Sequence, residues 1–270
     1  MIHLEAVEFR EAPPALAERF PFSVPVIASL IGQRLEFRTP VTFLVGENGS
    51  GKSTLLEGIA CAARAITVGT VDAERDRTLA AGQALARAMR LTWSRRTRRG
   101  FYLRAEDFFG YATRMERLRE ELEADARAIA EDTSRSALAR SLGQMPYARE
   151  LAAMRERYGE GLDARSHGES FLELFRARFQ PNGLYLLDEP EAPLSPTRQL
   201  TLLSLLKTMA EEQGAQFIIA THSPILMSLP GATILGFDDG APREIPYDAV
   251  EHVTVTREFL NHPDAFLRHL

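Results

Sequence analysis

A glycine-rich phosphate loop constrains this chain more than any other feature. Residues 41–54 read VTFLVGENGSGKST: an apolar, β-branched run, then the pattern G-x-x-x-x-G-K-S, then a helical pattern to about Ala65. Glycines let backbone N–H groups turn toward a phosphate chain, and the following helix N-terminus adds its positive dipole end. The predicted phosphate-binding residues are Gly46, Glu47, Asn48, Gly49, Ser50, Gly51, Lys52, Ser53 and Thr54.

Two side chains of this loop have distinct predicted roles. Among the 32 Lys and Arg residues only Lys52 and Lys207 are lysine, so lysine is retained at the motif in an arginine-rich chain. A compact ammonium fits between two phosphates where a planar guanidinium fits badly, which assigns Lys52 to the β- and γ-phosphates. The Ser53 hydroxyl is a suitable oxygen ligand for Mg²⁺.

A pair of carboxylates follows a second apolar run. Leu184–Leu187 predicts a buried strand that ends at Asp188 and Glu189, within GLYLLDEPE. Strand alternation sends these two side chains in different directions, which suits Asp188 as a Mg²⁺ ligand and Glu189 as the group that polarises the attacking water. The alternative interpretation is an acidic turn after a core strand.

A histidine stands at the end of a third apolar run. Residues 215–224 read AQFIIATHSP, so His222 follows a strand predicted over Phe217–Ala220. Ligands of open parallel sheets bind at the carboxyl ends of the strands, where His222 could hydrogen-bond a γ-phosphate. A satisfied polar residue at a strand end is the alternative.

The segment RSHGESF at residues 165–171 allows two interpretations. Ser166 and Glu169 have the spacing of a capping box at the start of a helix, which is a purely structural role. A helix N-terminus with Ser166 and Gly168 is also an anion site, and it could close over a triphosphate held by another subunit.

Together these segments resemble the ATP-binding-cassette ATPases, in the order phosphate loop, signature, Asp-Glu, switch histidine. The chain is similar to small soluble "AAA-family" or predicted ATPases, kin to recombination and chromosome-maintenance ATPases. Leu187–Pro190 looks like the Walker B box, and Leu194–Pro196 falls where the D-loop lies. His167 departs from the signature glycine, and Ser195 stands in place of the D-loop Asp. No clear Q-loop glutamine is present, and Glu106 is the candidate at that point of the chain.

This resemblance implies a fold, two cofactors and an assembly. The fold is α/β, a P-loop domain with a mostly parallel sheet, an antiparallel β portion and a helical subdomain. The implied activity is ATP hydrolysis with Mg²⁺, in which Lys52, Glu189 and His222 are catalytic and Ser53 and Asp188 hold the metal. ATP would join two subunits head to tail, and the signature residues would complete the partner's site; these are Ser166, Gly168 and Glu169.

The sequence predicts a single ATPase domain with an insertion. Residues 1–69 and 160–270 form the predicted nucleotide-binding core, and 70–159 form a strand-turn-strand plus helices. Residues 2–9 alternate as an edge strand does. Helices are predicted at Met115–Ala130 and about Tyr147–Arg157, and sixteen residues span only about 24 Å, too short for a long arm.

Seven arginines and no acidic residue lie between residues 87 and 104, in a chain of net charge −5. The segment predicts a hairpin with an arginine-rich turn at 95–99, which could bind a nucleic-acid backbone, with aromatic residues for stacking. The residues assigned to that contact are Arg95, Arg96, Arg98 and Arg99. A solvated turn, or pairing with the acidic helix 116–125, is the alternative.

Composition narrows the remaining choices. The single cysteine, Cys61, excludes an internal disulfide framework. The sequence also contains no run of about 20 apolar residues, the length needed to span a bilayer. A cytoplasmic protein is therefore expected. Two other functions stay open: the ATPase subunit of a transporter, and an ATP-gated switch with negligible turnover. Candidates to stack on adenine are Phe9, Phe20, Phe22 and Phe37, although such residues are more often plain core.

Overall fold

The computed structural model describes residues 1–10, 18–67, 77–134, 136–158, 167–238 and 240–268, with the backbone alone at 77, 106–116, 155–158 and 167–170. The chain forms two compact units, one made of Met1–Ala105 with Phe179–Leu270 and the other of Glu106–Arg178. The first unit takes in residues 77–105, which the sequence analysis placed in the insertion. None of the described helices is long and apolar enough to cross a membrane.

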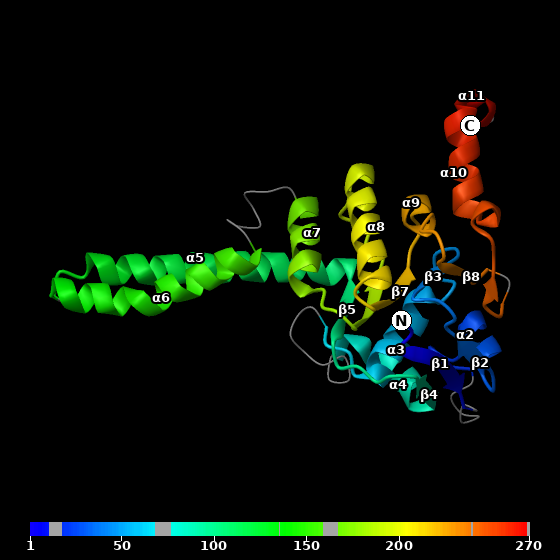
Figure 1. The fold of residues 1–270 in the computed structure, drawn as a ribbon, viewed down its shortest axis with the longest axis horizontal. Helices are drawn as coiled ribbons and strands as arrows, with labels where there is room; N and C mark the ends of the chain where they lie inside the picture. The colour runs from blue at the N-terminus through cyan, green and yellow to red at the C-terminus, as the bar shows by residue number, and fades with distance from the viewer. Residues whose placement is uncertain (11–17, 68–76, 135, 159–166, 239, 269–270) are drawn as a thin grey trace. The chain divides into compact units, whose positions relative to one another are not determined.

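A six-stranded sheet is the centre of the first unit (Figure 1). In spatial order its strands are β5 (Gly100–Arg104), β6 (Leu184–Asp188), β7 (Gln216–Ala220), β3 (Val41–Val45), β8 (Thr233–Gly236) and β9 (Arg243–Glu244). Every pairing is parallel except that of β9 with β8. β3, β6 and β7 are buried along their whole length, as strands covered on both faces must be. The predicted α/β fold with a mostly parallel sheet is confirmed.

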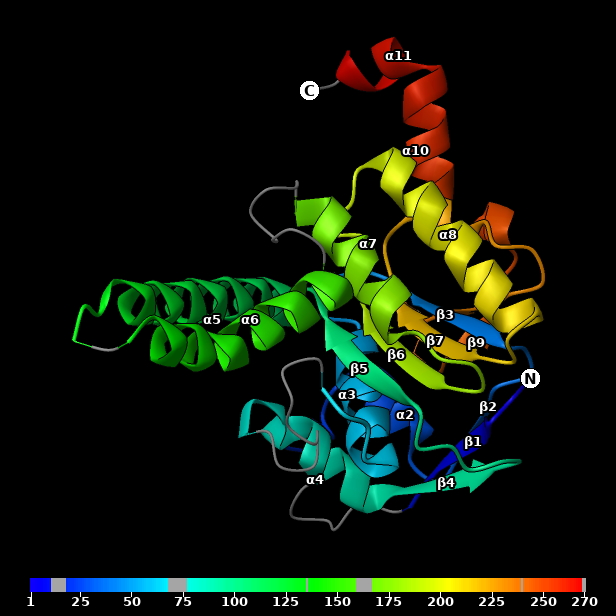
Figure 2. The same cartoon turned by 60° about the vertical axis from the view of Figure 1, so that its left-hand side comes forward.

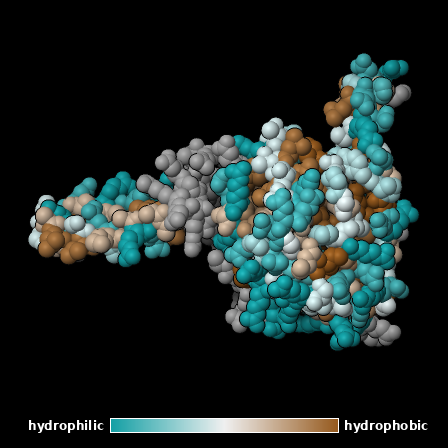
Figure 3. All heavy atoms as spheres, viewed as in Figure 1, coloured by the Kyte–Doolittle hydropathy of each residue, from teal (hydrophilic) through white to brown (hydrophobic). Residues whose placement is uncertain are grey.

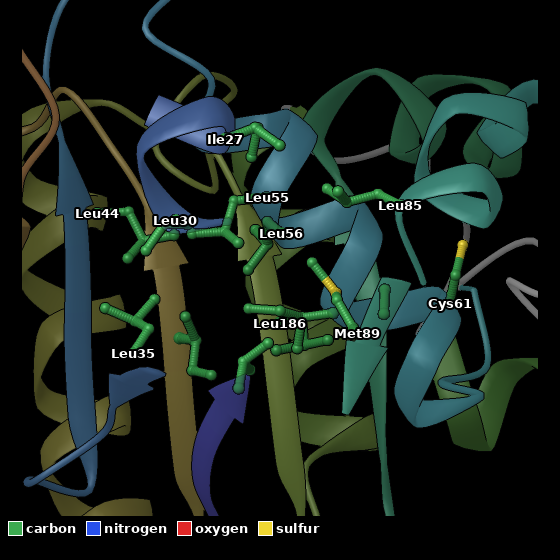
Figure 4. Packing of buried hydrophobic residues seen from close by; sticks show 14 of the residues in the cluster. Ile27, Leu30, Leu35, Leu44, Leu55, Leu56, Cys61, Leu85, Met89 and Leu186 are labelled. Atoms are coloured by element: carbon green, nitrogen blue, oxygen red, sulfur yellow. The ribbon is translucent and has the colours of Figure 1, made fainter. Parts of the chain in front are cut away.

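Helices pack on both faces of this sheet. Figure 2 shows α3 (Lys52–Ala63) and α8 (Pro196–Glu211) on opposite faces. The remaining helices of the unit are α2 (Pro25–Leu30), η1 (Arg77–Leu79), α4 (Ala80–Ala88), α9 (Pro224–Met227), η2 (Tyr247–Ala249), α10 (Glu251–Asn261) and α11 (Pro263–Leu267). On the α3 face, Leu55 and Leu56 pack with Leu44 and Leu186 of the sheet in one core cluster (Figure 4). On the other face, the Tyr185 and Phe217 rings stack at 5.1 Å.

A second, antiparallel sheet has the order β2 (Arg34–Glu36), β1 (Leu4–Phe9), β4 (Met89–Trp93). The sequence predicted an edge strand at 2–9, but β1 is the central strand, because β4 pairs with its second edge. Gln216 of the parallel sheet holds β1 in place. Its Oε1 accepts hydrogen bonds from the His3 and Leu4 amides at 2.8 Å, and its Nε2 donates to the Leu4 carbonyl at 2.9 Å. The buried amide is thus satisfied, and it ties the two sheets together.

The predicted hairpin around the arginine-rich turn is wrong. β4 pairs with β1 in the antiparallel sheet, whereas β5 pairs with β6 in the parallel one, so residues 94–99 connect two sheets. The reason is burial. Phe101, Tyr102 and Leu103 are successive buried residues, and only a strand covered on both faces can bury all three.

Hydrophilic residues prevail in Figure 3 along the lower part of this unit, around α4 and β4.

The second unit is a helical hairpin with one further helix, made of α5 (Ala105–Glu131), α6 (Ala137–Tyr158) and α7 (His167–Arg178). α5 has 27 residues, about 40 Å at 1.5 Å per residue, so the helix predicted at 115–130 is far too short. α6 also exceeds its prediction, with 22 residues and Pro146 inside it. The Gln144 side chain of α6 donates to the Ala126 carbonyl of α5 at 3.1 Å. Figure 3 shows hydrophobic residues at the far end of this hairpin.

Candidate functional site

Three strand ends meet at the carboxyl edge of the parallel sheet, the edge at which β3, β6 and β7 finish. Ala220, the last residue of β7, pairs with Leu44 of β3 on one side and with Asp188 of β6 on the other. The phosphate loop begins two residues after Leu44, and His222 lies two residues after Ala220. Strand register therefore brings together the three motifs that the sequence predicted.

The phosphate loop (residues 46–53) packs closely against α2. Gly51 has φ +99°, and a Cβ there would lie 2.5 Å from a methyl of Val26, so only glycine fits. Lys52 is the first residue of α3, and its Nζ donates to the Gly46 carbonyl at 2.7 Å and to the Glu47 carbonyl at 2.9 Å. An ammonium carries three donors, so one remains for a ligand. Burial lowers the pKa of Lys52, and nearby Glu189 and Asp188 oppose that shift.

Ser53 and Asp188 form the second contact of the site. The Ser53 hydroxyl donates to Oδ1 of Asp188 at 3.0 Å. Only 8% of Asp188 is exposed, and burial raises the pKa of this carboxyl to about 7, although the Ser53 hydrogen bond opposes the shift. A carboxylate that burial has made costly to ionise is stabilised by a cation beside it.

Glu189 differs from its neighbour Asp188 in exposure and backbone. Its side chain is 46% exposed, and its φ of +49° lies in the left-handed region, which is rare for a residue other than glycine. The Glu189 amide donates to the Ala220 carbonyl at 2.9 Å, which holds this conformation against β7. The carboxylate thus has access to solvent at the end of β6 and is free to reach a water molecule.

His222 is held by contacts from two other segments. Its backbone amide donates to Oε1 of Glu191 at 2.7 Å, and its Nδ1 lies 2.8 Å from Nε2 of His252 on α10. Its Nε2 is buried, lies 3.8 Å from the Glu189 carboxylate, and has no hydrogen-bond partner among the described residues. Burial, Lys52 and His252 lower the pKa of His222, which favours neutral imidazole. If Nε2 carries the proton, then His252 donates to Nδ1 and fixes that tautomer.

These residues fit a nucleotide phosphate and a divalent cation. The Ser50 hydroxyl inside the loop is buried and lacks a partner among the described residues, as does His222 Nε2. The Ser50 hydroxyl can donate, as can His222 Nε2 in the tautomer that carries its proton there, and the third Lys52 donor brings the number available to phosphate oxygens to three. The Ser53 hydroxyl and the Asp188 carboxylate supply the oxygen ligands that Mg²⁺ prefers.

Two family models match separate parts of the chain. The model described as "AAA domain" matches residues 27–72, which contain the whole phosphate loop. The model described as "AAA domain, putative AbiEii toxin, Type IV TA system" matches residues 169–228, which contain Asp188, Glu189 and His222. The chain thus resembles AAA-domain proteins over these two segments. The resemblance stated from the sequence is confirmed.

Solved structures that resemble the chain include a transporter cassette and an Smc head domain. A dimeric bacterial ABC transporter cassette is 19% identical, with a TM-score of 0.46 over 92% of this chain and 99% of that chain. An Smc head domain from Pyrococcus furiosus, with an extended coiled coil and bound to the C-terminal domain of ScpA, is 12% identical, with a TM-score of 0.45 over 96% and 100% of the two chains. No curated protein matches the chain.

Several other predicted positions lie outside the described residues or are described only as backbone. Ser166 lies outside them, and Gly168 and Glu169 are described only as backbone in the first turn of α7. Glu106 is likewise described only as backbone, in α5. Ser195 is the exposed residue before α8. Among the adenine candidates, Phe20 is 65% exposed, whereas the other three belong to the core; these are Phe9, Phe22 and Phe37.

Sequence reasoning missed three residues of the site. Glu191 holds His222 through its backbone, His252 bonds its ring, and Asp238 accepts a hydrogen bond from the Glu47 amide at 2.7 Å. The second glutamate of DEPE was a local signal for Glu191. His252 and Asp238 reach this site through the fold, so nothing near them in the sequence marks them.

Proposed function

We propose that the chain binds ATP with Mg²⁺ at the carboxyl edge of the parallel sheet and hydrolyses it. The observation that carries this proposal is the convergence of Lys52, the Ser53–Asp188 pair, Glu189 and His222 at three adjacent strand ends. Each has the chemistry that one part of phosphoryl transfer requires.

Lys52, with its free donor, would bind the β- and γ-phosphates. Ser53 and Asp188 would hold Mg²⁺, which, when bound, neutralises charge on the phosphate oxygens. Glu189 would polarise the attacking water, because its carboxylate is accessible to solvent and close to His222. His222 would donate from Nε2 to the γ-phosphate and respond to its loss.

Steady-state phosphate release tests this function. We expect purified protein with excess Mg²⁺-ATP to release many equivalents of phosphate per chain, and EDTA to stop release. Release that stops after one equivalent or less would favour the ATP-gated switch with negligible turnover instead.

We also propose that ATP joins two chains head to tail. Ser166, Gly168 and Glu169 of one subunit would then complete the partner's nucleotide site, as the similarity of residues 166–169 to the signature implies. Glu189→Gln should accumulate an ATP-bound dimer, because the amide keeps the shape of the carboxylate but polarises water poorly. Light scattering with saturating Mg²⁺-ATP measures this, and a persistent monomer would overturn the head-to-tail arrangement.

Mixed subunits test whether the signature acts on the partner. Ser166→Arg should block docking of the partner's γ-phosphate, and Lys52→Ala should inactivate its own phosphate loop. A mixed dimer keeps one intact loop facing one intact signature, so mixing the two inactive variants should restore about one working site per mixed dimer. If mixed dimers form and remain inactive, Ser166 is only a helix cap.

A further inference from the structure

A pocket of about 350 Å³ lies at the amino edge of the parallel sheet, the edge at which β5 and β6 begin. Its lining includes Arg64, Trp93, Arg96, Thr97, Arg98 and Arg99. α3 separates it from the phosphate loop, because the helix begins at Lys52 in that loop and ends at Ala63 in the pocket wall. The pocket is therefore distinct from the proposed ATP site.

The charge of the pocket has one sign. Four of its lining residues are arginines and none is acidic; the arginines are Arg64, Arg96, Arg98 and Arg99. Arg96 and Arg98 are exposed, and among the described residues no carboxylate lies within ion-pair distance of either one. Guanidinium groups bind phosphate oxygens in a two-pronged geometry, so an anion with several oxygens is the complementary ligand.

The arginine-bearing segment has a defined shape. The Thr97 hydroxyl donates to the Asn182 carbonyl at 2.9 Å and accepts from the Arg99 amide at 3.1 Å. The Arg99 guanidinium donates to the Pro181 carbonyl at 3.1 Å. Gly100 follows with φ +118°, and a Cβ there would lie 1.7 Å from the Leu184 carbonyl oxygen. These contacts fix the backbone under Arg96 and Arg98, which lowers the entropy lost when a ligand binds.

Trp93 adds a flat aromatic surface to the same pocket. It lies at the end of β4, is partly buried, and packs against the core cluster. Anchored aromatic rings next to arginines are the combination on which nucleobases stack while their phosphates are neutralised. A volume of about 350 Å³ falls within the roughly 300–1,000 Å³ of ligand sites.

We propose that this pocket binds a nucleotide, with its phosphate on Arg96 and Arg98 and its base beside Trp93. The nucleotide is either free or part of a single strand, and the chemistry of recognition is the same in both. The proposal replaces the predicted arginine hairpin with a site of defined residues. It does not depend on the proposed ATPase activity.

The only tryptophan of the chain lines this pocket, so intrinsic fluorescence reports on it. We would titrate the protein with oligothymidylate of twelve nucleotides and with thymidine monophosphate, at about 25 and 200 mM salt. The Lys52→Ala background prevents binding at the phosphate loop. We expect a saturable change in Trp93 fluorescence that weakens with salt, because neutralised phosphates release counterions.

Two matched double variants identify the residues responsible. Arg96→Gln with Arg98→Gln should weaken binding at least tenfold and flatten the salt slope by about two units if both guanidiniums touch phosphate. Arg34→Gln with Arg38→Gln removes the same charge from β2 and the residues after it, and should leave affinity within about twofold. Unfolding curves check that every variant is folded.

The outcomes separate the sources of the ligand and decide the proposal. Equal affinity for the monophosphate and the oligonucleotide indicates a free nucleotide, and much tighter binding of the oligonucleotide indicates a strand. Three results would overturn the proposal: no fluorescence change with either ligand at low salt, oligonucleotide binding by anisotropy without a change at Trp93, or equal loss of affinity in both double variants.

Discussion

The two edges of the parallel sheet hold their charged side chains in opposite ways. At the carboxyl edge, Lys52 and Asp188 are buried, and each bonds to another part of the protein before any ligand arrives. At the amino edge, Arg96 and Arg98 are exposed above a backbone that is itself held in place. Burial shifts the pKa values of Lys52 and Asp188, whereas solvent screens exposed arginines. Chemistry is therefore expected at the first edge, and charge-driven binding at the second.

The largest effect that this comparison predicts is the loss of ATP binding when Lys52 is replaced. Lys52→Ala should weaken ATP binding by at least about 100-fold, because the buried ammonium is the point charge nearest the phosphates. Lys207→Ala is the matched control, since Lys207 lies exposed on α8. Calorimetric titration with Mg²⁺-ATP measures both. Similar ATP affinities for the two variants would show that residues 46–53 are not the phosphate-binding loop.

Asp188→Asn should change how stability depends on pH. The pKa of the Asp188 carboxyl is about 7 in the folded protein against 3.8 in the unfolded chain. Between these values the folded state binds more protons, so the Asp188 contribution to the unfolding free energy falls as pH rises and then levels above pH 7. Asn cannot titrate, so without Mg²⁺ the variant should gain on the order of 3 kcal/mol relative to wild type between pH 4.5 and 8.

Urea unfolding at the two pH values measures that gain, with Glu212→Gln as an exposed control. The control should track the wild type across the range. If Asp188→Asn tracks it as well, burial does not raise the Asp188 pKa.

His252→Phe should lower turnover about three- to tenfold with little change in ATP affinity. The ring would still fill the space on α10 but could not donate to Nδ1 of His222, so the tautomer of His222 would no longer be fixed. Steady-state kinetics measures kcat and KM separately. His262→Phe, at an exposed position after α10, is the control. An unchanged kcat would mean that His252 only packs against His222.

The smallest effect is expected for an exposed ion pair on the antiparallel sheet. Arg34 bonds the Glu8 carboxylate at 2.6 Å, yet both side chains are more than a third exposed. Solvent screening limits such pairs, so Arg34→Gln should cost less than about 1 kcal/mol of unfolding free energy. A loss above about 2 kcal/mol, measured by urea unfolding, would show that exposed charges of this molecule contribute more than the comparison assumes.

Features that depend on residues close together in the sequence could be predicted, whereas contacts between residues far apart in the chain could not. The phosphate loop, Asp188 and His222 each follow a short buried strand, so local pattern was enough to place them. The contact of His252 with His222 joins residues thirty positions apart and depends on where α10 packs. For the same reason local pattern predicted a β4–β5 hairpin, although each strand had a better partner in another sheet. The length of α6 was underestimated because Pro146 lies inside it, and proline normally interrupts a helix.

The most direct test of the central claim measures ATP affinity and phosphate release together for Glu189→Gln. If the carboxyl edge binds ATP through the phosphate loop and hydrolyses it through Glu189, affinity should stay within about threefold of wild type while the release rate falls at least about 100-fold. A release rate close to wild type, or a parallel collapse of affinity and rate in a folded variant, would contradict the account.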